Sequence, residues 1–102
     1  MKKAQVIWSD EALNDLETIY DFLAEKSQPA AQRMVESILS RSKQLESFPE
    51  SGAKQETKAG SKEYRYLVEG NYKVIYRYQQ ENRAIYIAVV FDTRYDPEKL
   101  SV

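Results

Sequence analysis

The hydrophobic positions along this chain follow two periods, which predict helices in the first half and strands in the second. Ser9 precedes two carboxylates and the first helical stripe, a pattern typical of a helix start, and this helix should run from Asp10 to Lys26. Pro29 suits the first turn of a second helix, which must stop before Pro49. The two helices should pair as a hairpin. Their apolar stripes are Leu13, Leu16, Ile19, Tyr20 and Leu23, then Ala31, Met34, Val35, Ile38, Leu39, Leu45 and Phe48.

Strand patterns flank this helical region. Lys3 to Trp8 is a short strand candidate, and Glu63 to Pro97 contains three runs rich in β-branched and aromatic residues. Short turns at Gly70-Asn71 and Gln80 to Arg83 separate those runs, whereas Pro49 to Lys62 has no period and is expected to be a long loop. The order β-α-α-β-β-β predicts an α+β fold with the helical hairpin packed on one face of a mainly antiparallel sheet. The helices should meet Ile85, Ile87, Val89 and Phe91.

Length and charge limit the organisation and the surface. With 102 residues, of which 42% are hydrophobic, residues 1–102 should form a single domain. The 15 Lys and Arg nearly balance the 16 Asp and Glu, so a net charge of −1 provides no global attraction to nucleic acid. Any site for a polyanion must therefore be local. No apolar run reaches the roughly 20 residues that span a bilayer, and no signal peptide is evident, so we expect a soluble, cytoplasmic protein.

The chain contains neither histidine nor cysteine. This composition excludes Ser-His and Cys-His catalysis, disulfides and thiolate metal sites. Asp92 and Asp96 are too few carboxylates for a dedicated metal site. We therefore expect no metal and no cofactor.

The middle run of the second half carries cations within a strand. Because side chains alternate between faces, Lys73, Ile75 and Arg77 share one side, which is both cationic and apolar. Such a face suits a polyanion or an acidic protein, but Lys73 and Arg77 could equally be solvent-facing residues paired with Glu69 or Glu81. The eight tyrosines could stack on bases, or could be half-buried strand residues.

Four segments, in this order, resemble the RelE/ParE superfamily of bacterial toxins. They are VIWSDEALNDLETIYDFL, FPESG, YRYLVEGNYKVIYRY and VVFDTRYDP, and together they span nearly the whole chain. The resemblance implies a toxin that a cognate antitoxin holds inactive by covering it with an extended or helical segment. It also allows for a higher toxin–antitoxin oligomer.

Members of that superfamily divide by target. Some cut messenger RNA on the ribosome, whereas others inhibit DNA gyrase. In the ribonuclease branch an arginine of the middle strand lies where this chain has Lys73, and cationic and aromatic residues follow the last strand, where this chain has Arg94 and Tyr95. Many members of both branches carry a histidine at the end of that strand, where this chain has Asp92. That departure argues against histidine-based cleavage.

A ribonuclease reading assigns chemistry to five residues. Lys73, Arg77 and Arg94 would stabilise charge on phosphorus, Asp92 would be the base, and Tyr95 or a lysine would be the acid. Glu56 is an alternative base, and Asp92 could instead cap the turn that follows it.

The binding hypothesis uses an overlapping set. Arg65, Lys73, Arg77, Arg94 and Tyr95 would contact an acidic antitoxin or the cellular target. The missing histidine and the slightly acidic net charge favour binding, with DNA gyrase as the target by family analogy. The alternatives are a ribosome-dependent endoribonuclease of messenger RNA and a degenerate member that retains only antitoxin binding.

Overall fold

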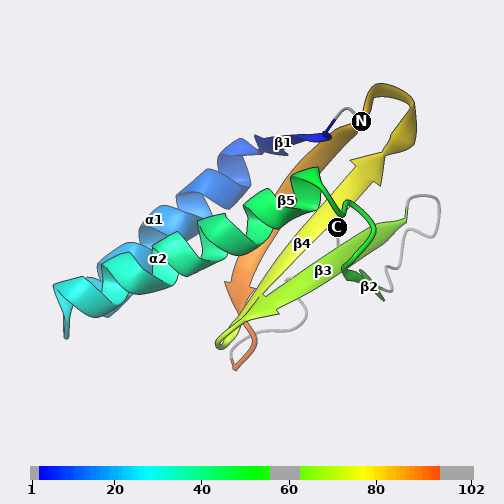
Figure 1. Cartoon of the computed structure of the whole chain (residues 1–102). Helices are drawn as coiled ribbons and strands as arrows, with labels where there is room; N and C mark the ends of the chain where they lie inside the picture. The colour runs from blue at the N-terminus through cyan, green and yellow to red at the C-terminus, as the bar shows by residue number, and fades with distance from the viewer. Residues whose placement is uncertain (1–2, 56–62, 95–102) are drawn as a thin grey trace.

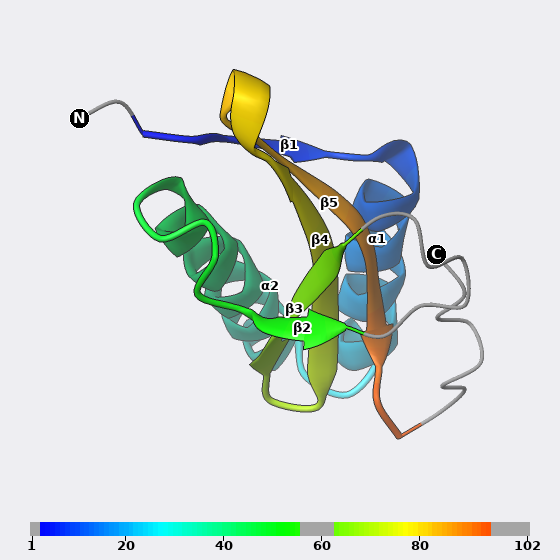
Figure 2. The same cartoon turned by 90° about the vertical axis from the view of Figure 1, so that its right-hand side faces the viewer.

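A computed structural model describes residues 3–55 and 63–94 of the chain. It has two layers, a five-stranded sheet and a pair of helices that lie together on one face of it (Figures 1 and 2). The elements in order are β1 (Gln5–Trp8), α1 (Asp10–Ala24), α2 (Gln28–Lys43), the 3-10 helix η1 (Gln44–Glu46), β2 (Ala53–Gln55), β3 (Tyr64–Glu69), β4 (Tyr72–Gln79), the 3-10 helix η2 (Gln80–Asn82) and β5 (Ala84–Asp92). This arrangement confirms the predicted α+β class.

Both helices begin where the sequence predicts, because each has a serine cap. The Ser9 hydroxyl accepts a hydrogen bond from the Ala12 N–H at 3.0 Å, and the Ser27 hydroxyl accepts one from the Ala30 N–H at 3.2 Å. The first helix ends at Ala24, slightly before the predicted Lys26, and the second ends at Lys43, before Pro49 as predicted. The second apolar stripe continues into η1, where Leu45 is fully buried.

The sheet has the strand order β1-β5-β4-β3-β2, in which β1 runs parallel to β5 and all other neighbours are antiparallel. The stretch predicted as a loop from Pro49 to Lys62 contains the short edge strand β2, which pairs with β3. Three residues are too few to show a period in the sequence. At the turn between β3 and β4, Gly70 has a φ of +61°, which favours glycine.

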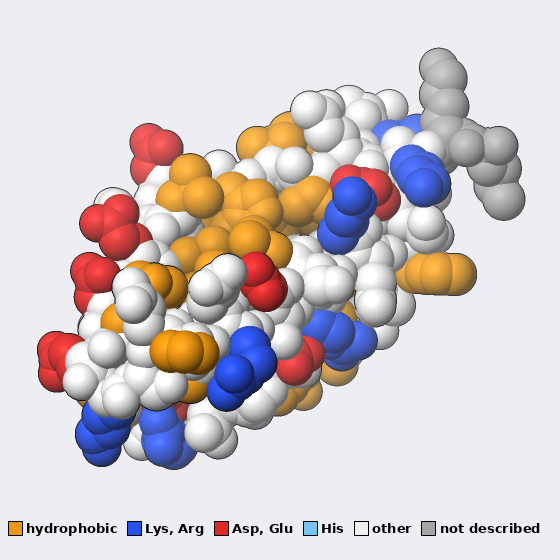
Figure 3. All heavy atoms as spheres, turned by 60° about the vertical axis from the view of Figure 1, so that its left-hand side comes forward, with side chains coloured by type: hydrophobic (Ala, Val, Ile, Leu, Met, Phe, Trp, Pro, Cys, Tyr) orange, Lys and Arg blue, Asp and Glu red, His pale blue; other side chains and the backbone are white. Residues whose placement is uncertain are grey.

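The core lies between the helices and the sheet. Ile38, Leu45, Ile85 and Ile87 are fully buried there, as predicted. Leu13 was expected to join them, but it is 50% exposed. Apolar side chains also gather on the surface of the face that the helices present (Figure 3).

A β-bulge in β5 overturns the predicted contacts of the last strand. Tyr76 pairs with Ile87 and Ile75 pairs with Val89, so Ala88 has no partner in the register. The extra residue reverses the alternation of faces beyond it. Val90 therefore enters the core beside the helices, whereas Val89 and Phe91, which were expected there, lie with Ile75 and Lys73 on the other side of the sheet.

Among the described residues, no helix is both long enough and apolar enough to cross a lipid bilayer.

Candidate functional site

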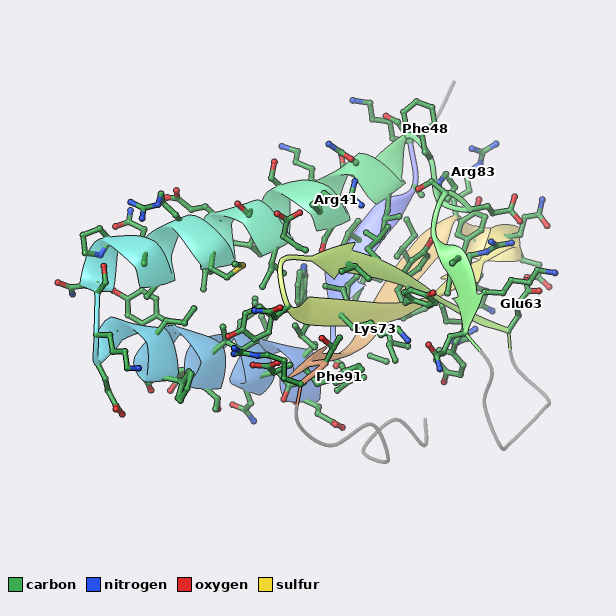
Figure 4. All side chains as sticks on the ribbon, turned by 90° about the horizontal axis from the view of Figure 1, so that it is seen from below. Arg41, Phe48, Glu63, Lys73, Arg83 and Phe91 are labelled. Carbon is green, nitrogen blue, oxygen red and sulfur yellow. The ribbon has the colours of Figure 1, made fainter. Side chains whose placement is uncertain are left out.

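The face of the sheet that the helices leave uncovered carries the cations singled out in the sequence. Cross-strand pairing places Tyr66 opposite Ile75, Ile75 opposite Val89, Lys73 opposite Phe91 and Arg77 opposite Tyr86. We call these seven residues the open sheet face: Tyr66, Lys73, Ile75, Arg77, Tyr86, Val89 and Phe91. Ile75 and Val89 are buried, while the other five side chains are partly exposed. Figure 4 shows Lys73 and Phe91 near the same end of the sheet.

Each cation of this face lies over a tyrosine ring. The Lys73 Nζ is 3.9 Å from the centroid of the Tyr66 ring, and the Arg77 guanidinium carbon is 5.0 Å from that of Tyr86. Partial burial lowers the pKa of Lys73 from its usual value. Glu69, which was one expected partner of these cations, pairs instead with Arg41 of α2 at 3.4 Å. Within residues 3–55 and 63–94, neither Lys73 nor Arg77 forms an ion pair with a carboxylate. No carboxylate in the described part of the chain therefore competes with an anionic partner for either charge.

Arg65 does not belong to the open sheet face. It lies opposite Tyr76, and its side chain, only 16% exposed, turns toward the segment after η1. There its Nη1 donates hydrogen bonds to the carbonyl oxygens of Gly52, at 2.8 Å, and Glu50, at 3.2 Å. These contacts give Arg65 a role in holding the FPESG segment.

Tyr76 is the second anchor of the same segment. Its hydroxyl accepts a hydrogen bond from the Gly52 N–H and donates one to the Pro49 carbonyl, both at 3.0 Å. Gly52 is required by this close approach, because a Cβ at that position would lie 2.6 Å from the tyrosine hydroxyl. Burial is the main cause that raises the pKa of Tyr76 above its usual value. Hydrogen bonds therefore join the FPESG segment to strand β4, and both belong to segments that carry the family resemblance.

Asp92 faces away from Lys73 and Arg77. Its register partner is Tyr72, which belongs to the core on the helix side of the sheet. The Asp92 carboxylate accepts hydrogen bonds from the Arg94 backbone N–H at 2.9 Å and from the guanidinium at 2.7 and 3.0 Å. The hydrogen bond from the Arg94 side chain is the main cause that holds the pKa of Asp92 below its usual value. Asp92 thus caps the turn that follows it.

The predicted site is therefore divided. The structure brings Lys73 and Arg77 onto one face and places Arg65, Asp92 and Arg94 elsewhere. Tyr95, Glu56 and Asp96 lie outside the described residues.

The sequence pattern alone did not single out Tyr66 and Tyr86 as the rings beneath the cations. The two rings could have been identified from the lengths of the turns. The turns at Gly70-Asn71 and Gln80 to Arg83 fix the cross-strand register, and this register places each ring next to its cation. The two short turns therefore determine which tyrosine each cation meets.

A known protein family matches the chain over almost its whole length. The family model, described as the ParE toxin of a type II toxin–antitoxin system, parDE, matches residues 6–97. A search of curated proteins finds no match.

Solved structures share the fold at low sequence identity. A chromosomal ParDE toxin–antitoxin system from P. aeruginosa matches with a TM-score of 0.70 and 21% identity, over 88% of this chain and 96% of that one. The toxin–antitoxin complex RelBE2 from Mycobacterium tuberculosis matches with a TM-score of 0.66 and 16% identity, over 88% and 98%. The archaeal RelE-RelB complex from Pyrococcus horikoshii OT3 matches with a TM-score of 0.65 and 17% identity, over 92% and 99%. These likenesses support the fold.

The family model covers nearly the whole chain, including the four segments that carry the resemblance noted in the sequence. That resemblance is confirmed. The chain belongs to the ParE toxins of type II toxin–antitoxin systems, within the RelE/ParE superfamily.

Proposed function

We propose that this toxin inhibits growth by binding a cellular target, DNA gyrase by family analogy, through the open sheet face, and that a cognate antitoxin neutralises it. One observation carries the preference for binding over RNA cleavage. The bulge at Ala88 leaves Asp92 on the opposite side of the sheet from Lys73 and Arg77. A base and its assisting cations must converge on one phosphate, and these groups do not.

The chemistry of Asp92 supports the same reading. A carboxylate already hydrogen-bonded to Arg94 is a weaker base than a free one, since its pKa is lowered. The guanidinium that would stabilise a phosphate is also occupied by that carboxylate at 2.7 Å. Two of the five residues of the ribonuclease hypothesis are thus committed to each other.

The open sheet face has the composition of a protein-binding surface. Aromatic rings and cations lie side by side, and Ile75 and Val89 form an apolar floor. Such rings and cations are enriched where proteins bind one another, and unpaired charges speed the encounter with an acidic partner. The antitoxin, expected to be encoded next to this gene, would cover this face with an acidic segment and so block the target.

The test is to express the chain alone in bacteria and compare the DNA-damage response with arrest of translation. The double variant Lys73→Glu with Arg77→Glu should relieve growth inhibition. The matched control, Arg33→Glu with Lys43→Glu, makes the same change of charge at exposed positions of α2 and should remain toxic.

A translating extract separates the two targets. The purified chain should leave messenger RNA intact there and should inhibit supercoiling by purified gyrase. Codon-phased cuts that Lys73→Ala or Arg94→Ala abolishes, in variants that still fold, would establish the ribonuclease instead. A chain that binds the antitoxin without inhibiting growth would be the degenerate member.

A further inference from the structure

Two exposed apolar residues border the open sheet face. Ile7 of β1 lies opposite Tyr86 and is 36% exposed, and Val68 of β3 lies opposite Lys73 and is 46% exposed. Residues that face each other across neighbouring strands point to the same side of the sheet, so both lie on the side of the cations. An apolar border strengthens the attraction between Lys73 or Arg77 and an anionic partner, because it excludes water when the two proteins meet.

The tyrosine rings hold the cations without cancelling their charge. A carboxylate that pairs with Lys or Arg neutralises it, whereas a tyrosine ring attracts it through the ring quadrupole and carries no net charge. The Lys73 Nζ lies 3.9 Å from the centroid of Tyr66, and the Arg77 guanidinium carbon lies 5.0 Å from that of Tyr86. Long cationic side chains lose rotamer freedom on binding, and a side chain already held by a ring loses less. The rings therefore prepare both charges for a partner.

The two cations extend to opposite sides of β4. Tyr66 belongs to β3 and Tyr86 belongs to β5, so Lys73 extends toward one neighbouring strand and Arg77 toward the other. The two cations are four positions apart in one strand, which places their Cα atoms about 13 Å apart. Ile75, fully buried, lies between them along β4. A matching partner carries two anionic groups at a comparable spacing, with an apolar group between them.

The same contacts favour a protein over a nucleic acid as the partner. Bases that stack on a tyrosine do so by covering the face of its ring. In this structure a cation already covers one face of the Tyr66 ring and one face of the Tyr86 ring. The carboxylates of a protein need the charges and not the ring faces, so they fit this arrangement better.

We propose that Tyr66 and Tyr86 are positioning residues of the open sheet face. They hold Lys73 and Arg77 as a fixed pair that binds two carboxylates of the target protein, with an apolar side chain of the target over Ile75. The inference rests on the proposed function, because it states how the same face recognises its target. An acidic surface whose carboxylates have a different spacing binds more weakly.

The test measures the Kd of toxin variants for purified DNA gyrase, used as the probe, at one fixed ionic strength. Tyr66→Leu should raise the Kd about fivefold, because Lys73 loses its ring contact, and Tyr86→Leu should do the same through Arg77. Tyr66→Phe keeps the ring and should restore the Kd to within about twofold of the wild type. Tyr20→Leu is the matched control, because Tyr20 is a partly exposed tyrosine of α1, outside the open sheet face.

A double-mutant cycle separates positioning from direct contact with the target. In the Lys73→Ala background, Tyr66→Leu should have no further effect on the Kd, since the ring acts only through the cation. At the apolar border, Val68→Ser should raise the Kd, whereas Leu39→Ser should not, because Leu39 is similarly exposed, at 42%, but lies on α2. Circular dichroism and urea unfolding verify that each variant is folded.

The possible failures point to different errors. Gyrase binding that Tyr66→Leu and Tyr86→Leu leave unchanged would refute the positioning role and leave the proposed function intact. A loss that persists in the Lys73→Ala background, or that Tyr66→Phe shares, would mean that Tyr66 contacts the target itself. Tight binding of single-stranded RNA that Tyr66→Leu abolishes would overturn the assignment of a protein partner. Wild-type toxin that does not bind gyrase would refute the proposed function, and this inference with it.

Discussion

Tyr76→Phe is the most discriminating test of how the FPESG segment is held. The substitution keeps the buried ring and removes only the hydroxyl that bridges the Gly52 N–H and the Pro49 carbonyl. Gly52 is buried, so its N–H is left without that acceptor. An orphaned buried donor costs about 1–3 kcal/mol, and we expect the free energy of unfolding to fall by that amount. For a domain of this size the Tm should fall by roughly 4–8 °C for each kcal/mol.

The loss of unfolding free energy in Tyr76→Phe should also depend on pH, because burial raises the pKa of Tyr76 in the folded state. A raised folded pKa means that the stabilising contribution is fully present below the unfolded pKa of about 10 and is lost as the pH rises above it. Tyr76→Phe has no phenol at this position. The difference in stability between wild type and variant should therefore be largest at neutral pH and should shrink above about pH 10.

Urea unfolding followed by circular dichroism, at neutral and at alkaline pH, measures both effects. The matched control is Tyr20→Phe on α1, because within the described residues the Tyr20 hydroxyl makes no hydrogen bond. That control should lie within about 0.5 kcal/mol of the wild type. A Tyr76→Phe variant as stable as this control, or one whose deficit is the same at both pH values, would refute the assigned role of the hydroxyl.

Three further predictions concern the core, the glycine and the turn. Ile87→Ala should lower the free energy of unfolding by about 2–5 kcal/mol in urea titrations, since Ile87 is fully buried, and a smaller loss would contradict the assigned core. Gly52→Ala should cost about 1–3 kcal/mol in the same assay, because its Cβ would lie 2.6 Å from the Tyr76 hydroxyl; no loss would mean that the segment moves away freely. Asp92→Asn should cost less than about 1 kcal/mol near neutral pH. Because the folded pKa of Asp92 is lowered, that deficit should disappear as the pH falls below about 4, and a deficit that persists in acid would exclude the ion pair with Arg94 as its source.

The helices were predictable from the sequence because their signals are local. Ser9 and Ser27 each cap the helix that the apolar stripe predicts, and the alternation in β4 correctly placed Lys73 and Arg77 on one face. These patterns depend only on backbone periodicity and on short-range hydrogen bonds.

The face of Asp92 was not predictable in the same way. A single residue without a register partner, Ala88, reverses the alternation of side chains between the two faces of β5. The hydrogen bond that Ala88 accepts comes from Ser9, 79 positions earlier in the chain. The position of Arg65 could not be predicted for a similar reason. Its guanidinium donates hydrogen bonds to the carbonyl oxygens of Glu50 and Gly52, in a segment whose sequence shows no periodic pattern. Interactions between distant segments decide both cases, and no local pattern encodes them.

Strand β5 makes hydrogen bonds with residues near the N-terminus, so this domain cannot complete its fold until the ribosome has made β5. The Ser9 hydroxyl reaches Ala88 and the Asp15 carboxylate reaches Val90, across sequence separations of 79 and 75 residues. β5 is also an interior strand of the sheet, between β1 and β4. A nascent chain made at about 5–20 residues per second therefore holds its two helices for several seconds before the strand that completes their core exists. The open sheet face includes residues of β5, so it cannot form on a nascent chain that ends before this strand.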